Sequence, residues 1–204
     1  SFPTRRSSDL DLYVRGEYRL EARLSVLGDF NVLNACAAFA VADHYHVDLN
    51  KAAERLALYQ GFTGRLQRFI KDGVLVIDDT YNASPVSMKA GLDVLENMAY
   101  GEGKKTAVLG DMFELGDRSA AFHYEVGVHA AKKKIDRLYL IGENILETQR
   151  GARENGAIFE IRHFASREAL AEALKEDMAP GDVIYLKASN GMKLKEVREA
   201  VTGG

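Results

Sequence analysis

The sequence predicts an α/β fold built on a doubly wound, mostly parallel sheet. From Arg65 onward, short apolar runs alternate with amphipathic segments of helical period. Strict alternation favours parallel strands, because parallel neighbours are joined by crossover helices that cover both faces of the sheet. Polar residues return only where an apolar run ends, as expected for strands that are buried on both faces.

The elements follow from these runs in chain order. We predict strands at residues 74–77, 106–109, 137–141, 158–164 and 183–186, and helices after Pro85, Asp117, Glu143, Ser166 and Asn190. Ser84 is a typical N-cap because Pro85 follows it at the first helical position, and Asp117 is interpreted as a cap in the same way.

The chain before Arg65 has a different pattern. Residues 12–27 have the composition of two strands around a turn at Arg15 and Gly16, and two helical segments follow, the second after a predicted N-cap at Asn50. Alanines surround Cys36, so we expect a packed thiol. The first ten residues are polar and without period, and we interpret them as a leader foreign to the protein. We therefore predict three parts: residues 1–10, 11–60 and 61–204.

Composition narrows the function. Hydrophobic residues make up 47% of the 204 residues, and 27 Lys and Arg nearly balance 30 Asp and Glu. This balance gives no reason to expect nucleic acid or an anionic membrane as a partner. A single cysteine fits a reducing compartment, and no apolar run approaches the ~18 residues of a membrane span, so we expect a cytoplasmic protein.

Chemically useful side chains stand at the predicted strand ends, where ligands bind in such sheets. Asp78 and Asp79 follow the first clear strand, Asp111 follows the second, and a turn beginning with Lys187 follows the last. Acids that face a lysine suit a site for hydroxyls or a metal together with an anion, although each acid could instead cap a helix. His123 has no metal-ligand spacing and is interpreted as a helix or surface residue. The chain contains neither a GxxxxGK[ST] loop nor a GxGxxG fingerprint.

Several segments together resemble the C-terminal part of the Mur ligases, in the branch that adds D-alanyl-D-alanine. They read GDFNVLNACAAFAVA, TGRLQRF, VLVIDDTYNASPVSMKAGLDVL, TAVLGDMFELGDRSAAFHYEVG and DVIYLKASNGMKLKEV. The resemblance implies that residues 61–204 form a Rossmann-like C-terminal domain and that residues 11–60 are the edge of a central ATPase domain.

The resemblance also implies a reaction in peptidoglycan precursor synthesis. Mg-ATP phosphorylates the terminal carboxylate of a UDP-N-acetylmuramoyl tripeptide, and the amine of D-alanyl-D-alanine then attacks the acyl phosphate. The phosphate loop and the Mg²⁺ ligands would lie in a preceding domain, so we expect this chain to be inactive alone. We expect a monomer.

The resemblance also implies roles for individual residues at matching positions. Asn31 and Asn34 match the residues on the adenine side of ATP, Arg65 matches a catalytic arginine that reaches the phosphates, and Asp79 matches a carboxylate that binds the ribose. Asp78 is expected to brace the turn. Substrate-binding residues are expected on two loops, as Tyr81, Asn82 and Ser84 and as Lys187, Ser189 and Asn190.

The chain departs from the family pattern at four of these loop and helix positions. Phe30 replaces the usual His, Ser84 the usual Asn, and Ala188 and Asn190 replace Gly and Arg. Loss of that arginine removes a bidentate donor to a carboxylate, so we expect the incoming dipeptide to be held differently.

Two alternatives stay open on the sequence. One is a non-catalytic module that binds a nucleotide or a peptide with the same fold. The other is a receiver-like phosphoacceptor domain, which also has paired acids, a third acid and a late lysine at strand ends. Strand order argues against a receiver. Asp111 ends the very next strand after Asp79, whereas a receiver has another strand between the two acids.

Overall fold

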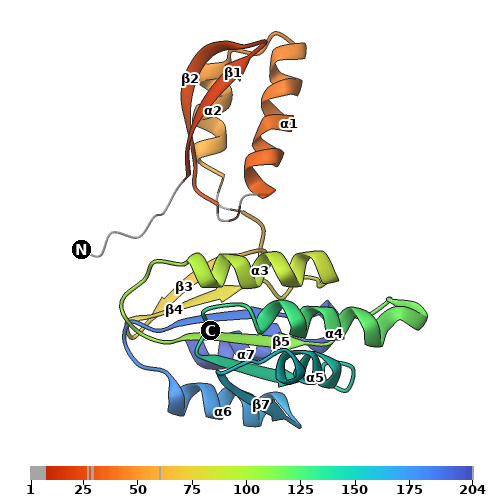
Figure 1. Ribbon diagram of the computed structural model, residues 1–204. Coiled ribbons are helices and arrows are strands. Elements are labelled where there is room, and N and C mark those ends of the chain that lie inside the picture. Colours follow the sequence, from red (N-terminus) through yellow and green to blue (C-terminus); the bar gives the residue numbers. More distant parts are fainter. Residues whose placement is uncertain (1–7, 27, 29, 60, 204) are drawn as a thin grey trace. The chain divides into compact units, whose positions relative to one another are not determined.

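The computed structural model describes residues 8–26, 28, 30–59 and 61–203 (Figure 1). These residues form two compact units that divide after Phe62. Most of the predicted leader, residues 1–7, and the predicted boundary at Gln60 lie outside the described residues. The last three leader positions, residues 8–10, belong to the first strand, whereas the sequence predicted strand structure only from residue 12.

The N-terminal unit is a hairpin packed against two helices. Strands β1 (Ser8–Val14) and β2 (Glu17–Leu24) pair antiparallel around Arg15 and Gly16, whose φ angles of 54° and 85° make the predicted turn. Helices α1 (Phe30–His44) and α2 (Leu49–Ala57) follow. One face of β2 meets α1 in a small core, formed by Leu20, Ala22, Leu24, Ala35 and Phe39.

Two predictions for this unit were wrong. The N-cap of α2 is Asp48, whose side chain accepts the backbone N–H groups of Asn50 and Lys51, because an aspartate one residue before the helix reaches both free donors. Cys36 is exposed, since the buried stripe of α1 runs through Ala35, Phe39 and Ala42 and leaves the thiol outside it.

The C-terminal unit is a six-stranded sheet with the order β3-β4-β8-β5-β6-β7. All neighbours are parallel except β3, which pairs antiparallel with β4 at the edge. The strands are β3 (Gln67–Lys71), β4 (Val74–Asp78), β5 (Lys105–Gly110), β6 (Arg137–Ile141), β7 (Glu160–Phe164) and β8 (Val183–Lys187). The predicted mostly parallel, doubly wound sheet is confirmed, and the last strand lies in its centre.

Helices cover both faces of this sheet (Figure 1). Helix α3 (Pro85–Asn97) packs on β5 and β8, and α4 (Ser119–Ala130) lies between α3 and α5 (Leu146–Glu154). On the opposite face, α6 (Arg167–Asp177) packs on β6 and β7, while α7 (Leu194–Thr202) packs on β3, β4 and β8. Successive side chains of each strand therefore enter different layers of the core.

Several boundaries differ from the sequence prediction. Strand β3 was not predicted, because its edge position leaves only one side to bury. The predicted strand from residue 158 begins at Glu160, with Ile158 fully exposed. Asp117 lies inside a 3-10 turn, Gly116–Arg118, and α4 begins after it without a side-chain cap. Ser84 caps α3 as predicted, in a reciprocal capping box with Ser87.

No helix among the described residues combines the length and the apolarity needed to cross a bilayer.

An ion cluster joins the C-terminal ends of α3 and α4. Lys133 Nζ lies 2.6 Å from Asp93 and 3.1 Å from Glu96, and Glu96 also accepts the backbone N–H of Lys134 at 2.9 Å. The Lys134 N–H and the Lys133 ammonium lower the pKa of the Glu96 carboxyl below its ordinary value. Asp93 raises the pKa of Lys133 in turn.

Substituting Glu96→Gln should remove a contribution to stability that depends on pH. Because the pKa of Glu96 is lower in the folded state, its contribution is present above its unfolded pKa and lost as pH falls through the folded pKa. We expect a loss of at most about 1 kcal/mol at pH 7 and a smaller loss at pH 3, measured by urea unfolding. The control is Glu172→Gln at an exposed position of α6; equal losses at both pH values for Glu96→Gln would contradict the prediction.

Candidate functional site

The predicted site residues of the C-terminal unit gather where β4, β8 and β5 end. These strands are neighbours in the sheet, so the loops that follow them meet at one edge. The register places Asp78 opposite Leu186, and the Asp79 N–H donates to the Leu186 carbonyl. The doubled acid therefore continues directly from the paired part of β4.

Asp79 is bonded to three other residues through its side chain. Its Oδ2 accepts hydrogen bonds from the Tyr185 hydroxyl at 2.8 Å and from Lys187 Nζ at 2.6 Å. Its Oδ1 accepts the backbone N–H of Leu66 at 3.3 Å. The side chain stays 13% exposed, so the carboxylate is an internal ligand that still reaches the surface.

The partners of Asp79 are deeply buried. Lys187 has a side chain that is 3% exposed, and its Nζ also donates to the Asn82 carbonyl at 3.0 Å. Burial lowers the pKa of Lys187 while the Asp79 carboxylate opposes that shift. Burial and the neighbouring Asp79 charge raise the pKa of Tyr185 well above its ordinary value. The Lys187 ammonium therefore lies beneath the loop after β4, although the sequence predicted it as a direct substrate contact.

Asp78 points to the other face of the sheet, as alternation along a strand requires. Its Oδ1 accepts both the N–H and the hydroxyl of Thr80, and its Oδ2 lies 3.3 Å from Nε of Arg198 on α7. The Arg198 guanidinium also lies over the Phe69 ring. Asp78 therefore braces the turn, as the sequence predicted.

Arg65 is exposed on a tight turn held against the end of β4. Gly64 and Leu66 both have left-handed φ angles, 70° and 51°. The Tyr81 N–H donates to the Gly64 carbonyl at 2.9 Å, and the Arg65 guanidinium lies 4.5 Å from the centroid of the Tyr81 ring. The turn thus presents a planar cation beside an exposed aromatic ring.

The loops after β5 and β8 are tied to each other. Ser189 donates its N–H to the Asp111 carbonyl at 3.0 Å, and its hydroxyl oxygen accepts the Phe113 N–H at 2.8 Å. Asp111 uses its carboxylate as a cap, accepting the backbone N–H groups of Glu143 and Ile145. Ser189 is therefore buried and engaged within the protein.

His123 was predicted as a helix or surface residue, and the structure buries it completely. Its Nε2 accepts the Met112 N–H at 3.0 Å, and its Nδ1 lies 2.8 Å from the Ser119 carbonyl. Because a backbone N–H can only donate, this geometry requires a neutral ring protonated on Nδ1. The His123 imidazole therefore anchors the loop after β5 through the Met112 N–H.

The remaining predicted residues face outward. Tyr81, Asn82, Ser84 and Asn190 are exposed on the loops after β4 and β8. Ser84 is also the cap of α3, so the same hydroxyl serves the helix. In the N-terminal unit, the Asn34 amide donates to the Asn31 side chain at 3.0 Å, which pairs these two residues on the first turns of α1.

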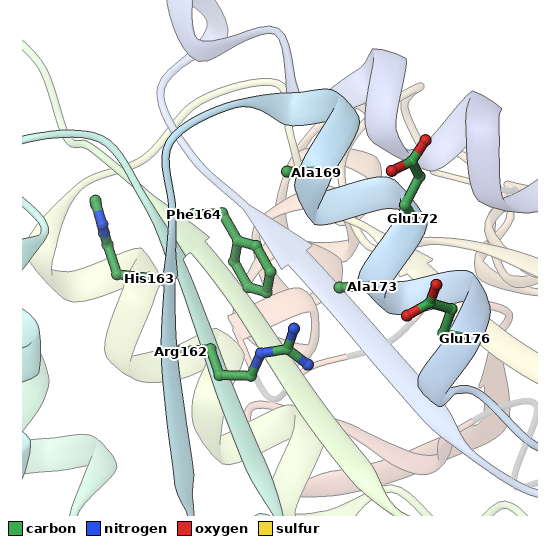
Figure 2. A pocket seen from close by; sticks show the side chains of 7 residues that line it. All are labelled: Arg162, His163, Phe164, Ala169, Glu172, Ala173 and Glu176. Atoms are coloured by element: carbon green, nitrogen blue, oxygen red, sulfur yellow. The ribbon is translucent and has the colours of Figure 1, made fainter.

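A separate pocket lies at the far edge of the sheet, between β7 and α6. In Figure 2, Arg162 and Phe164 project from β7 toward α6, whereas His163 points to the opposite side. Arg162 donates to the Tyr139 hydroxyl and to Asp177, so its charge is already compensated. Burial, followed by the Asp177 hydrogen bond, raises the pKa of Tyr139 to about 12. None of the predicted site residues lines this pocket.

No group of three His, Cys, Asp or Glu side chains within residues 8–26, 28, 30–59 and 61–203 is arranged to hold a metal ion.

Comparison with protein families matches residues 64–190 to the glutamate ligase domain of the Mur ligases. The chain belongs to the Mur ligase family. The matched range runs from the Arg65 turn to Asn190, so it includes every candidate residue of the C-terminal unit. Family membership also sets aside the receiver-like alternative.

Three relatives match most of this chain. The UDP-N-acetylmuramoyl-tripeptide–D-alanyl-D-alanine ligase of Bacillus subtilis is 39% identical over 175 residues, which cover 85% of this chain and 38% of that protein. The MurF structure from Acinetobacter baumannii superposes with a TM-score of 0.84 at 28% identity, covering 98% of this chain and 43% of its own. The MurF ligase of Thermotoga maritima, solved in complex with ADP, gives 0.80 at 27% identity, covering 97% and 44%. This Mur ligase chain spans about two fifths of the length of these relatives.

The sequence did not identify Tyr185, Arg198 or His123 as parts of the candidate site. Tyr185 lies two residues before Lys187, so strand alternation placed both on one face, and that signal was available. Arg198 and His123 lie on helices whose rotation against the sheet is set by packing. Their contacts could not be derived from local sequence.

Substituting His123→Phe should destabilise the C-terminal unit by about 1–3 kcal/mol, because it leaves the buried Met112 N–H without an acceptor. Urea unfolding measures the loss. The control is His129→Phe on the same helix, whose side chain is 26% exposed and pairs with Asp93, and which we expect to lose less than about 1 kcal/mol. Equal losses for the two variants would contradict this reading of His123.

Proposed function

We propose that this chain is the C-terminal part of an ATP-dependent, ADP-forming ligase that joins D-alanyl-D-alanine to UDP-N-acetylmuramoyl-tripeptide. The observation that carries the proposal is the 39% identity to the B. subtilis ligase of that name. The ADP complex of the T. maritima relative supports a nucleotide as co-substrate. ATP and a UDP-linked precursor are cytoplasmic metabolites, so we propose that the enzyme acts there.

The proposed reaction makes a poor electrophile reactive. The terminal carboxylate of the tripeptide takes the γ-phosphoryl group of ATP and ADP leaves. The amine of the dipeptide then attacks the carbonyl carbon of the acyl phosphate, and inorganic phosphate leaves as the amide forms. Mg²⁺ would screen the phosphate charge, and we propose that its ligands belong to the part of the enzyme that this chain does not contain.

Four residues are assigned to nucleotide binding in this proposal. The exposed Arg65 guanidinium offers several donors in one plane, which suits phosphate oxygens and the charge that develops during transfer. Asp79 Oδ1 accepts a single N–H from Leu66 and keeps a lone pair for a ribose hydroxyl. Asn31 and Asn34 present amide groups of the kind that bind an adenine edge.

The peptide substrates would meet the loops after β4 and β8. Tyr81, Asn82, Ser84 and Asn190 are exposed there and would contact them directly. Lys187 and Ser189 would act from beneath, through the Asn82 carbonyl and the Phe113 N–H. The exposed Asn190 can give hydrogen bonds to a carboxylate but supplies no positive charge.

A chimaera tests this proposal. This chain replaces the matching C-terminal part of the B. subtilis ligase, and phosphate release is measured with Mg-ATP, UDP-muramoyl tripeptide and D-alanyl-D-alanine. We expect release that requires all three substrates. A chimaera that binds ADP without turnover would instead favour a non-catalytic binding module.

Within that chimaera, Arg65→Met should lower kcat about 100-fold, the typical effect of removing one charge-stabilising donor. The stem of methionine keeps the packing beside Tyr81, so folding should survive. The matched control is Arg153→Met, an exposed arginine on α5. Similar kcat values for the two variants would remove Arg65 from the reaction.

A further inference from the structure

Tyr185 and Lys187 bring polar groups into the core of the sheet, where apolar side chains would pack at lower cost. The Tyr185 side chain is fully buried and the Lys187 side chain is 3% exposed, and both donate to Asp79 Oδ2. A buried ion pair often contributes little net stability, because desolvation offsets the attraction. The main contribution of the Lys187–Asp79 pair is therefore to fix the position of the Asp79 carboxylate.

The other oxygen of Asp79 holds a turn that would not persist alone. Leu66 has φ at 51°, which is unfavourable for a branched side chain, and its N–H donates to Asp79 Oδ1 at 3.3 Å. The preceding glycine, Gly64, accepts from the Tyr81 N–H. The Asp79 carboxylate and the Tyr81 N–H thus anchor the two residues that flank Arg65.

Helix α3 packs directly against the Tyr185 hydroxyl. A Cβ atom on Gly91 would overlap the Tyr185 hydroxyl, so α3 passes directly over the phenol oxygen. Lys187 is also bonded to the Asn82 carbonyl, so the hydroxyl and the ammonium each have a second contact while both donate to Asp79 Oδ2. The carboxylate has one orientation that satisfies both.

We propose that Tyr185 and Lys187 are positioning residues that lock the Arg65 turn through Asp79. The buried hydroxyl and ammonium orient Oδ2, Oδ1 then holds the Leu66 N–H, and the guanidinium of Arg65 is presented beside Tyr81. The consequence for catalysis rests on the proposed nucleotide role of Arg65. The mechanical part is independent of that role.

The first test uses Tyr185→Phe and a matched control, Tyr139→Phe. Both tyrosines are fully buried in the same sheet and donate to an aspartate, but Tyr139 binds Asp177 on the opposite face. Amide hydrogen exchange of this chain is followed by NMR. We expect the Leu66 amide to exchange on the order of tenfold faster in Tyr185→Phe, relative to the amides of β6, and to be unchanged in Tyr139→Phe.

Lys187→Met provides a second variant that keeps the length of the side chain and removes its charge. It should raise Leu66 exchange by at least as much as Tyr185→Phe. Leu66 exchange that is unchanged in both variants would overturn the proposal. Uniformly faster exchange throughout the sheet, equal to that of Tyr139→Phe, would also overturn it, because it would show a general loss of stability.

The second test places Tyr185→Phe in the active chimaera. We expect the KM for ATP to rise about five- to tenfold and the KM for D-alanyl-D-alanine to stay within about twofold, the effect of one hydrogen bond acting on the nucleotide side. An unchanged KM for ATP together with faster Leu66 exchange would leave the lock standing and overturn its catalytic consequence. The role of Arg65 itself is decided separately by the kcat of Arg65→Met, while a chimaera that lacks all activity in its unsubstituted form fails the proposed function itself.

Discussion

Two consecutive carboxylates at the end of β4 point to opposite faces of the sheet. Each requires a cation, because an unpaired buried charge is costly. Asp79 meets Lys187 on the α3 side of the sheet, and Asp78 meets Arg198 on the α7 side. Both cations come from the last strand and the last helix of the chain. The geometry of the site therefore depends on how the C-terminal β8–α7 segment seats against β4.

The same segment also fixes the second half of the site. Ser189, directly after β8, binds the loop after β5 through Asp111 and Phe113, and His123 supports that loop through Met112. The loops after β4, β5 and β8 come from distant parts of the sequence. Hydrogen bonds between their backbone groups and buried residues hold them together. The exposed groups, Arg65 and Tyr81 among them, rest on a rigid base.

Sequence periodicity was enough to predict the sheet, the strand ends and the cap at Ser84, because these depend on local burial and local hydrogen bonds. It was insufficient where burial was partial, as in edge strand β3, or where a neighbouring residue competed for a cap, as Asp48 did with Asn50. The sequence also predicted Lys187 in the site but did not identify Asp79 as the partner of its ammonium group. Which acid a buried lysine meets depends on strand order, and the position of β8 between β4 and β5 cannot be derived from local pattern.

That central position of β8 has a consequence for the order in which the protein is made. A ribosome makes the β3–β4 hairpin and the β5, β6 and β7 strands before it reaches residue 183, and until then β4 and β5 each carry an unpaired row of backbone donors and acceptors. The sheet can close only after residues 183–187 have been made. A chain that ends before β8 lacks the strand that joins β4 to β5, and the two unpaired strand edges favour aggregation over a shorter functional protein.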